Sequence, residues 1–178
     1  MIIPVVFIHF GHSDHLPVVI EQAKKWSDQV IVMGDTANGT RTIPVEDFSA
    51  DIQEFTKTYE HLSTNGHNVE LFCMTRWLAL RNLMRAQKIG TCLYLDSDVM
   101  LFSHPTKEWD KFSMFEFTLV HWTSGHTSFW TLAGIEKFCE FMLRLYRDKS
   151  GYDWEKISSH YHIRRKHGLG GGVCDMTL

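Results

Sequence analysis

Hydrophobic positions follow two kinds of spacing in the first half of the chain. Short apolar runs at residues 4–8 and 29–34 are rich in β-branched side chains, which is typical of buried strands. Between and after them, apolar side chains recur at i, i+3 and i+4, the spacing of an amphipathic helix. This helical spacing occurs in three segments: 15–26, 48–62 and 69–88. The first half therefore predicts strands and helices in alternation.

Less regular patterns predict the remaining elements. Short strands are indicated at three places: 43–45, 114–120 and 129–132. Helical spacing returns at 135–147 and 154–166. Together with an apolar strand that begins at Thr91, this order favours an α/β fold, a Rossmann-like open mixed sheet with helices on both faces. Ligands bind such sheets beyond the carboxyl ends of the strands.

Two aspartates follow the strand that begins at Thr91. The apolar run ends at Leu95, and Asp96 and Asp98 come next. In an extended backbone, side chains two residues apart point to the same side. A buried carboxylate pair is costly unless a cation lies beside it, and Mn²⁺ or Mg²⁺ bound to a diphosphate would compensate both charges. The alternative is a turn in which the aspartates accept hydrogen bonds from main-chain amides.

Composition excludes several classes of function. The 178 residues suffice for one domain, and 44% of them are hydrophobic. The net charge is -3 and the longest basic run is Arg164-Arg165-Lys166, so no nucleic-acid partner is expected. No apolar run approaches the length of a transmembrane segment. The four cysteines form no CxxC pair, which is typical of free thiols in a reducing compartment and predicts a cytoplasmic protein.

The aspartate pair and its surroundings resemble the DxD region of GT-A-fold glycosyltransferases. The likeness consists of the strand–Asp–Ser–Asp–apolar unit at 91–102 and of the long helix before it, which carries Arg76. The family implies metal-dependent transfer of a sugar from a nucleoside diphosphate, most often UDP, to a hydroxyl of a glycan or small-molecule acceptor. We therefore expect one GT-A-like nucleotide-sugar-binding domain over 1–178. We expect it to be truncated at the C-terminus, because 173–178 begins a new element and stops.

The resemblance also implies roles for individual residues. Asp96 and Asp98 would hold Mn²⁺ or Mg²⁺, with Asp96 also reaching the donor, and Asp175 would be the catalytic acidic group facing the acceptor. Further contacts with the substrates are expected at six positions: His12, Asp35, Arg76, His121, Gly125 and His126. Many family members add a histidine as a third metal ligand, and this sequence assigns none.

Structural roles compete with these functional ones. Arg76 is alternatively a solvated charge or forms a salt bridge on its helix. Asp35 alternatively belongs to a turn, and Asp175 alternatively caps a helix. The eleven histidines include three at i, i+3 and i+6 from His9 onward. Since a strand-to-helix loop does not bring such histidines into a tetrahedron by spacing alone, and no HExxH is present, no zinc site is predicted.

Two other functions agree with part of the sequence. Haloacid-dehalogenase-type phosphatases also place DxD after an apolar strand, with the first aspartate as the nucleophile. Their motif opens the domain and carries Thr or Val where this chain has Met100. The third possibility is a non-catalytic nucleotide-sugar-binding domain. Hydrolysis of p-nitrophenyl phosphate would indicate the phosphatase, and binding of UDP-sugars without release of UDP would indicate the non-catalytic domain.

Overall fold

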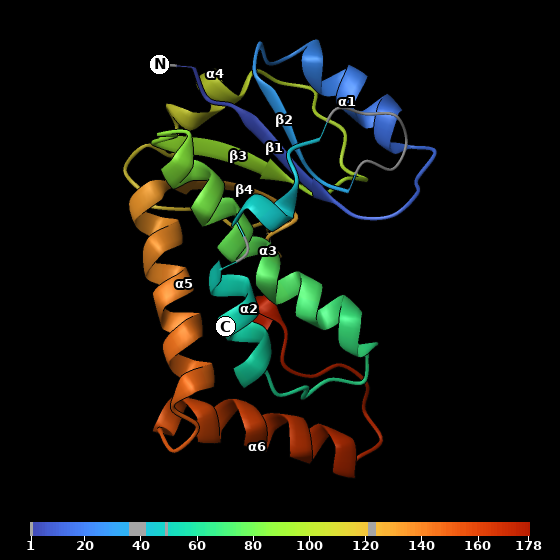
Figure 1. Cartoon of the computed structure of the whole chain (residues 1–178), viewed down its shortest axis with the longest axis vertical. Coiled ribbons are helices and arrows are strands. Elements are labelled where there is room, and N and C mark those ends of the chain that lie inside the picture. Colours follow the sequence, from blue (N-terminus) through green and yellow to red (C-terminus); the bar gives the residue numbers. More distant parts are fainter. Residues whose placement is uncertain (1, 36–41, 49, 121–123) are drawn as a thin grey trace.

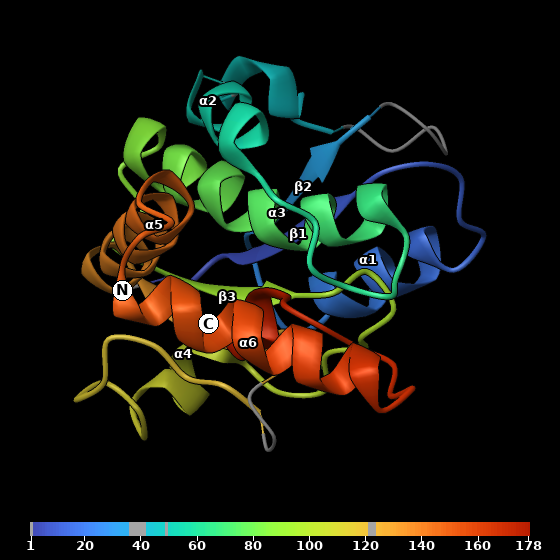
Figure 2. The ribbon, with the colours of Figure 1, turned by 90° about the horizontal axis from the view of Figure 1, so that it is seen from below.

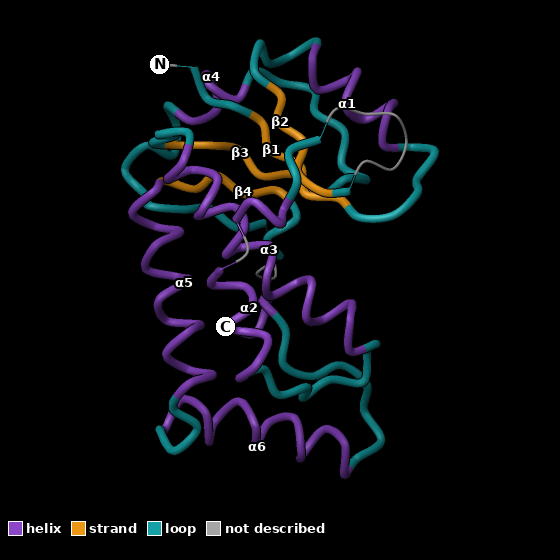
Figure 3. Tube along the Cα trace, viewed as in Figure 1, coloured by secondary structure: helices purple, strands orange, loops and turns teal. Residues whose placement is uncertain are grey.

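A four-stranded sheet forms the upper part of the molecule in Figure 1 and is drawn in orange in Figure 3. The computed structural model describes residues 2–35, 42–48, 50–120 and 124–178. In spatial order the strands are β2 (Val30–Gly34), β1 (Val5–His9), β3 (Thr91–Leu95) and β4 (Thr127–Thr131). Strand β1 is parallel to β2 and β3, whereas β4 is antiparallel to β3. The predicted α/β fold with an open mixed sheet is confirmed.

Helices cover both faces of this sheet, as predicted. Because successive side chains of a strand point to opposite faces, β1 contributes to two hydrophobic cores. On one face Phe7 packs with α1 (Leu16–Lys24) and α4 (Pro105–Trp109). On the other face Ile8 belongs to a larger core. Its helices are α2 (Ala50–Thr58), α3 (His67–Ala86), α5 (Leu132–Arg147) and α6 (Tyr152–Lys166). Figure 2, seen from below, has α6 in front and the sheet behind α3.

The strand predicted at 114–120 is wrong. Among the described residues this segment forms isolated bridges, one of which joins Phe117 to β4. An apolar run indicates a strand only where the side chains are covered, yet Met114 and Phe115 are 83% and 55% exposed. The edge strand predicted at 43–45 is likewise reduced to a single bridge to β2, and a 3₁₀ helix follows it.

The carboxyl ends of three strands meet at one edge of the sheet. Strand β1 ends at His9, opposite Gly34 of β2. A Cβ on Gly34 would lie 1.7 Å from the His9 carbonyl oxygen, and its φ of +146° also favours glycine. Beyond Leu95 of β3 the chain turns at once, because the Val99 N–H donates to the Asp96 carbonyl at 3.0 Å. The edge at which ligands were expected therefore exists, and it carries the two aspartates.

Candidate functional site

A cavity of about 620 Å³ opens at the carboxyl edge of β1 and β3. Its walls come from the end of β1 and the loop after it, from α3, and from the turn after β3. Four of the predicted site residues line it together: His12, Arg76, Asp96 and Asp98. Ten further residues line it, and sequence reasoning assigned none of them to the site; seven of the ten have polar side chains: His9, Ser13, Asp14, His15, Cys73, Tyr94 and Ser97. The fold thus gathers four of the expected site residues around one cavity.

Asp96 is held in place through one of its carboxylate oxygens and through its main chain. Its Oδ1 accepts hydrogen bonds from Arg76 Nη1 and from the Tyr94 hydroxyl, both at 2.8 Å. Its main-chain N–H donates to the His126 carbonyl at 2.8 Å. Asp96 Oδ2 accepts no hydrogen bond from another residue in the described ranges. One oxygen is therefore fixed by the protein, and the other remains for a ligand.

The expected geometry of the aspartate pair is wrong in one respect. The prediction placed Asp96 and Asp98 in an extended backbone, but the strand ends at Leu95 and both aspartates lie in the turn closed by Val99. Ladder pairing with β4 stops at Leu95, and one further main-chain bond, from the Asp96 N–H to the His126 carbonyl, precedes the turn. Asp96 is half-buried and Asp98 is exposed. The pair therefore lines the cavity without forming a buried pair of parallel carboxylates.

Arg76 links two carboxylates in the interior. Its side chain is 7% exposed. Its Nη1 donates to Asp96, and its Nη2 donates to Asp175 Oδ2 at 2.5 Å. Burial by itself would lower the pKa of Arg76, but the neighbouring Tyr94, Asp175 and Asp96 outweigh burial and raise it. Arg76 therefore forms salt bridges, as one interpretation held, but its partners lie outside its helix and the interpretation as a solvated charge is wrong. A direct contact with donor phosphates stays a prediction.

Asp175 reaches this network from the far end of the sequence. It begins a 3₁₀ helix, η4 (Asp175–Thr177), but the N-cap is Cys174, so the alternative role of Asp175 as a cap is wrong. The Asp175 side chain is only 4% exposed. Its Oδ2 accepts from Arg76 and also from Trp77 Nε1 at 3.0 Å. No pattern in the sequence indicates that Trp77, the residue after Arg76, bonds to Asp175.

Histidines of the first loop surround one side of the cavity. The His9 ring bonds to the Ser97 hydroxyl at 2.8 Å, which ties the end of β1 to the aspartate turn. His12 is exposed and pairs with Asp14 at 2.9 Å. His15 bonds to the Ser13 hydroxyl at 2.8 Å. The regular spacing of the three histidines was the signal in the sequence that could have found His9 and His15.

The remaining predicted contacts do not line this cavity. Asp35 is exposed, and its Oδ2 accepts from the Gly11 N–H at 2.9 Å, which joins the loops after β1 and β2. The His126 ring bonds to the Thr127 hydroxyl. Gly125 packs against Trp77, where an added Cβ would lie 2.7 Å from the indole ring. His121 lies outside the described residues.

The two aspartates fit a hard divalent cation that brings its own phosphate ligands. Within the described ranges, no group of three or more His, Cys, Asp or Glu side chains could hold a metal ion. Mg²⁺ is commonly bound by only one or two carboxylates, with substrate phosphates and waters completing its coordination. Asp98 and the second oxygen of Asp96 supply such a donor set. These two residues would therefore hold Mn²⁺ or Mg²⁺ only together with a diphosphate.

Cys73 is expected to be a poor nucleophile although it lines the cavity. Burial, followed by the charge of Asp175, raises the pKa of the Cys73 thiol to about 11. At pH 8 its thiolate fraction is then about 100–300-fold below that of an ordinary thiol. We expect iodoacetamide labelling of Cys73, followed by peptide mass spectrometry, to be slower by that factor and to accelerate about tenfold per pH unit up to pH 11.

The control is the same labelling reaction in guanidinium chloride, where Cys73 should react at the rate of a free thiol. Labelling of the native protein at that rate at pH 8 would contradict the buried environment of the thiol. All four cysteines are free in the structure, as predicted.

Comparisons with family models and with curated proteins assign no function to this chain. The chain matches no protein-family model and no curated protein. None of the helices in the described part of the chain is both long enough and apolar enough to cross a membrane. The strongest observation on function is therefore the geometry at the carboxyl edge of the sheet.

Proposed function

We propose that this protein is a metal-dependent glycosyltransferase that moves a sugar from a nucleoside diphosphate, with a UDP-sugar as the expected donor, to an acceptor hydroxyl. One observation carries the proposal. A polar cavity at the carboxyl ends of β1 and β3 is lined by Asp96 and Asp98, and Arg76 connects Asp96 to a third acidic residue, Asp175. Open α/β sheets bind their ligands at this edge. Asp96, Asp98 and the helix with Arg76 also carry the resemblance to GT-A enzymes, and that resemblance implies the role of Asp175.

Each residue has a distinct task in this proposal. Asp98 and Asp96 Oδ2 would hold the cation, which when bound would neutralise negative charge on the leaving diphosphate. The bond between the anomeric carbon and the diphosphate oxygen breaks, and its electron pair leaves with the diphosphate. The acceptor oxygen bonds to the anomeric carbon, and its proton passes to Asp175 Oδ1. Arg76 fixes the positions of Asp96 and Asp175 relative to each other.

Neither rival function gains support from the arrangement of the site. A phosphatase of the haloacid-dehalogenase type would use Asp96 Oδ2 as its nucleophile, since Oδ1 already accepts two hydrogen bonds, and would have no role for Asp175. A non-catalytic nucleotide-sugar-binding domain would use the same cavity without needing Asp175. The buried link from Asp96 through Arg76 to Asp175 favours the transferase, because it joins the donor cavity to a second acidic group.

The test is release of UDP from UDP-glucose and UDP-galactose, with Mn²⁺ and with EDTA. With Mn²⁺ we expect slow release of UDP, because water takes the place of the missing acceptor. With EDTA, which removes the metal, we expect no release of UDP. Hydrolysis of p-nitrophenyl phosphate without UDP release would instead indicate the phosphatase. A rise in melting temperature with UDP and Mn²⁺, but no turnover of either UDP-sugar, would indicate the non-catalytic domain.

A further inference from the structure

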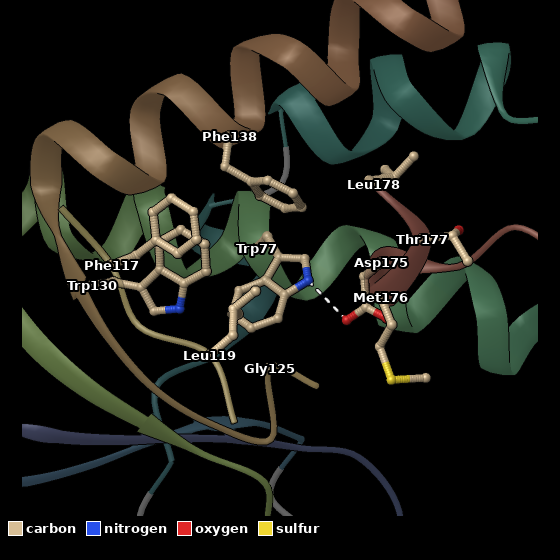
Figure 4. Close-up of a pocket in the computed structure, with 10 residues that line it drawn as sticks. All are labelled: Trp77, Phe117, Leu119, Gly125, Trp130, Phe138, Asp175, Met176, Thr177 and Leu178. Atoms are coloured by element: carbon tan, nitrogen blue, oxygen red, sulfur yellow. Dashed lines mark hydrogen bonds between the residues drawn. The ribbon is translucent and has the colours of Figure 1, made fainter. Parts of the chain in front are cut away.

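A second pocket lies on the other side of Asp175 from the aspartate turn. Its volume is about 290 Å³. The walls are mainly apolar, with four aromatic rings, and come from α3, the segment before β4, β4 itself, α5 and the end of the chain from Asp175. The lining residues that matter here are Trp77, Phe117, Leu119, Trp130, Phe138 and Asp175. Figure 4 shows the Trp77 indole between the Phe117–Trp130 pair and Asp175.

The rings of this pocket are held in fixed positions by one another. The Phe117 ring stacks on Trp130, with centroids 4.8 Å apart and an interplanar angle of 14°. Trp77 packs against Trp130 at 5.2 Å and against Phe138 at 6.1 Å. Trp77 and Trp130 are each 2% exposed, whereas Phe117 is 42% exposed. A pre-formed aromatic wall with one accessible ring is typical of a site for a flat apolar group.

Three polar side-chain groups of the wall already form hydrogen bonds within the protein. Trp77 Nε1 donates to Asp175 Oδ2, and Trp130 Nε1 donates to the Ser128 hydroxyl at 2.8 Å. The Thr177 hydroxyl is hydrogen-bonded to the main chain of Cys174. Asp175 Oδ1 accepts no hydrogen bond from another residue in the described part of the chain. Through its side chains the described wall therefore offers a ligand aromatic and aliphatic surface and one carboxylate oxygen.

This lining selects the chemistry of the ligand. A sugar ring in the pocket would leave several hydroxyl groups without partners, and each buried unpartnered group costs about 1–3 kcal/mol. A group of negative charge would meet Asp175 and Asp96, which share the single positive charge of Arg76. An uncharged aromatic group that carries one hydroxyl matches both the rings and the free carboxylate oxygen.

We infer that this pocket binds the apolar aromatic part of the acceptor and directs its hydroxyl toward Asp175 Oδ1. The description of the ligand as an acceptor rests on the proposed function, but the binding of the aromatic group does not. Asp175 lines the aromatic pocket and is also linked to the donor cavity, because Arg76 bonds both to Asp175 and to Asp96. The donor cavity and the aromatic pocket thus meet at one buried ion-pair chain.

The experiment measures binding of 4-(trifluoromethyl)phenol by fluorine NMR in the absence of donor and metal. We expect saturable line broadening with the unaltered protein. Leu119→Trp fills the pocket and Phe117→Ala removes one wall, so each should weaken binding at least about tenfold. Phe115→Ala is the matched control, because Phe115 is exposed on the same segment but does not line the pocket. It should leave the affinity unchanged.

A second ligand tests the direction of the hydroxyl. 4-(Trifluoromethyl)anisole has no hydrogen to donate to Asp175, so it should bind about tenfold more weakly than the phenol. Equal affinity for the two compounds would overturn the role of Asp175 in the pocket. The binding site itself is overturned if the unaltered protein shows no saturable broadening, or if Leu119→Trp binds the phenol as well as the unaltered protein does.

The final arm adds UDP-glucose and Mn²⁺ and looks for the aryl glucoside by mass spectrometry. Formation of the glucoside, and its loss in Leu119→Trp, supports the inference that the pocket receives the acceptor. Phenol binding with no release of UDP would remove the transferase proposal and leave the aromatic site standing. Release of UDP without phenol binding would leave the transferase and remove the aromatic site. The two failures are therefore distinguishable.

Discussion

Replacement of Arg76 with methionine is expected to lower the free energy of unfolding by about 3–5 kcal/mol. Arg76 is 7% exposed and Asp175 4% exposed, so the substitution leaves a buried carboxylate without its cationic partner. Asp96 is 31% exposed, so it can regain contact with water and contributes less to the loss. Urea unfolding followed by circular dichroism measures the change. If the variant does not fold, its loss of unfolding free energy already exceeds the lower limit of this range.

Arg85→Met is the matched control, because it removes the same side chain from the same helix. Arg85 bonds to Glu136 at the surface, where the two side chains are 51% and 39% exposed. Such a pair contributes about 1 kcal/mol or less. The double variant Arg76→Met with Asp175→Asn should recover part of the loss, since the unpaired buried charge is then gone. If Arg76→Met and Arg85→Met destabilise equally, the interior ion-pair chain has no energetic importance.

Replacement of Asp98 with alanine is expected to lower metal-dependent UDP release by at least about 100-fold. The side chain is exposed on the turn after β3, and the proposal makes it a ligand of the cation that bridges to the diphosphate. Its removal should also abolish the rise in melting temperature produced by UDP with Mn²⁺. Stability without ligands should stay within about 0.5 kcal/mol, because exposed side chains contribute little. Calorimetry with UDP and Mn²⁺ measures the affinity directly.

Asp28→Ala serves as the control for Asp98→Ala. Asp28 is also an exposed aspartate in a connection next to the sheet, but it precedes β2 at the opposite edge. It should leave both UDP release and the response to Mn²⁺ unchanged. An affinity for UDP and Mn²⁺ that survives in Asp98→Ala would remove the cation site on which the proposed function depends.

The site was predicted in part because some of its residues are local to one strand end. Asp96 and Asp98 follow a strand whose apolar run is easily recognised, and His12 follows the parallel neighbouring strand. Parallel strands bring such segments to one edge without any further information. Tyr94 could also have been found from the sequence, because it lies two residues before Asp96 and side chains at this spacing point to the same side of a strand. In the structure its hydroxyl donates to the Asp96 carboxylate.

Other parts of the site depend on contacts that leave no local signal. The Arg76–Asp175 bond joins residues 99 positions apart. The apolar pattern of 114–120 predicts a strand. In the structure Met114 and Phe115 are exposed, and the Phe117 ring stacks on Trp130. Whether an apolar side chain is covered is decided by what packs on it, not by its own spacing.

By itself the sequence determined the alternation of strands and helices, the two-sided sheet, and the edge at which the aspartates lie, because spacing and chain direction are properties of neighbouring residues. The tertiary structure alone decided that Arg76 is paired with two acids, that Asp175 is buried beside it, and that four aromatic rings surround a pocket there. Burial and pairing arise only when distant segments pack together. The residue pattern of one segment does not show which distant segments pack against it.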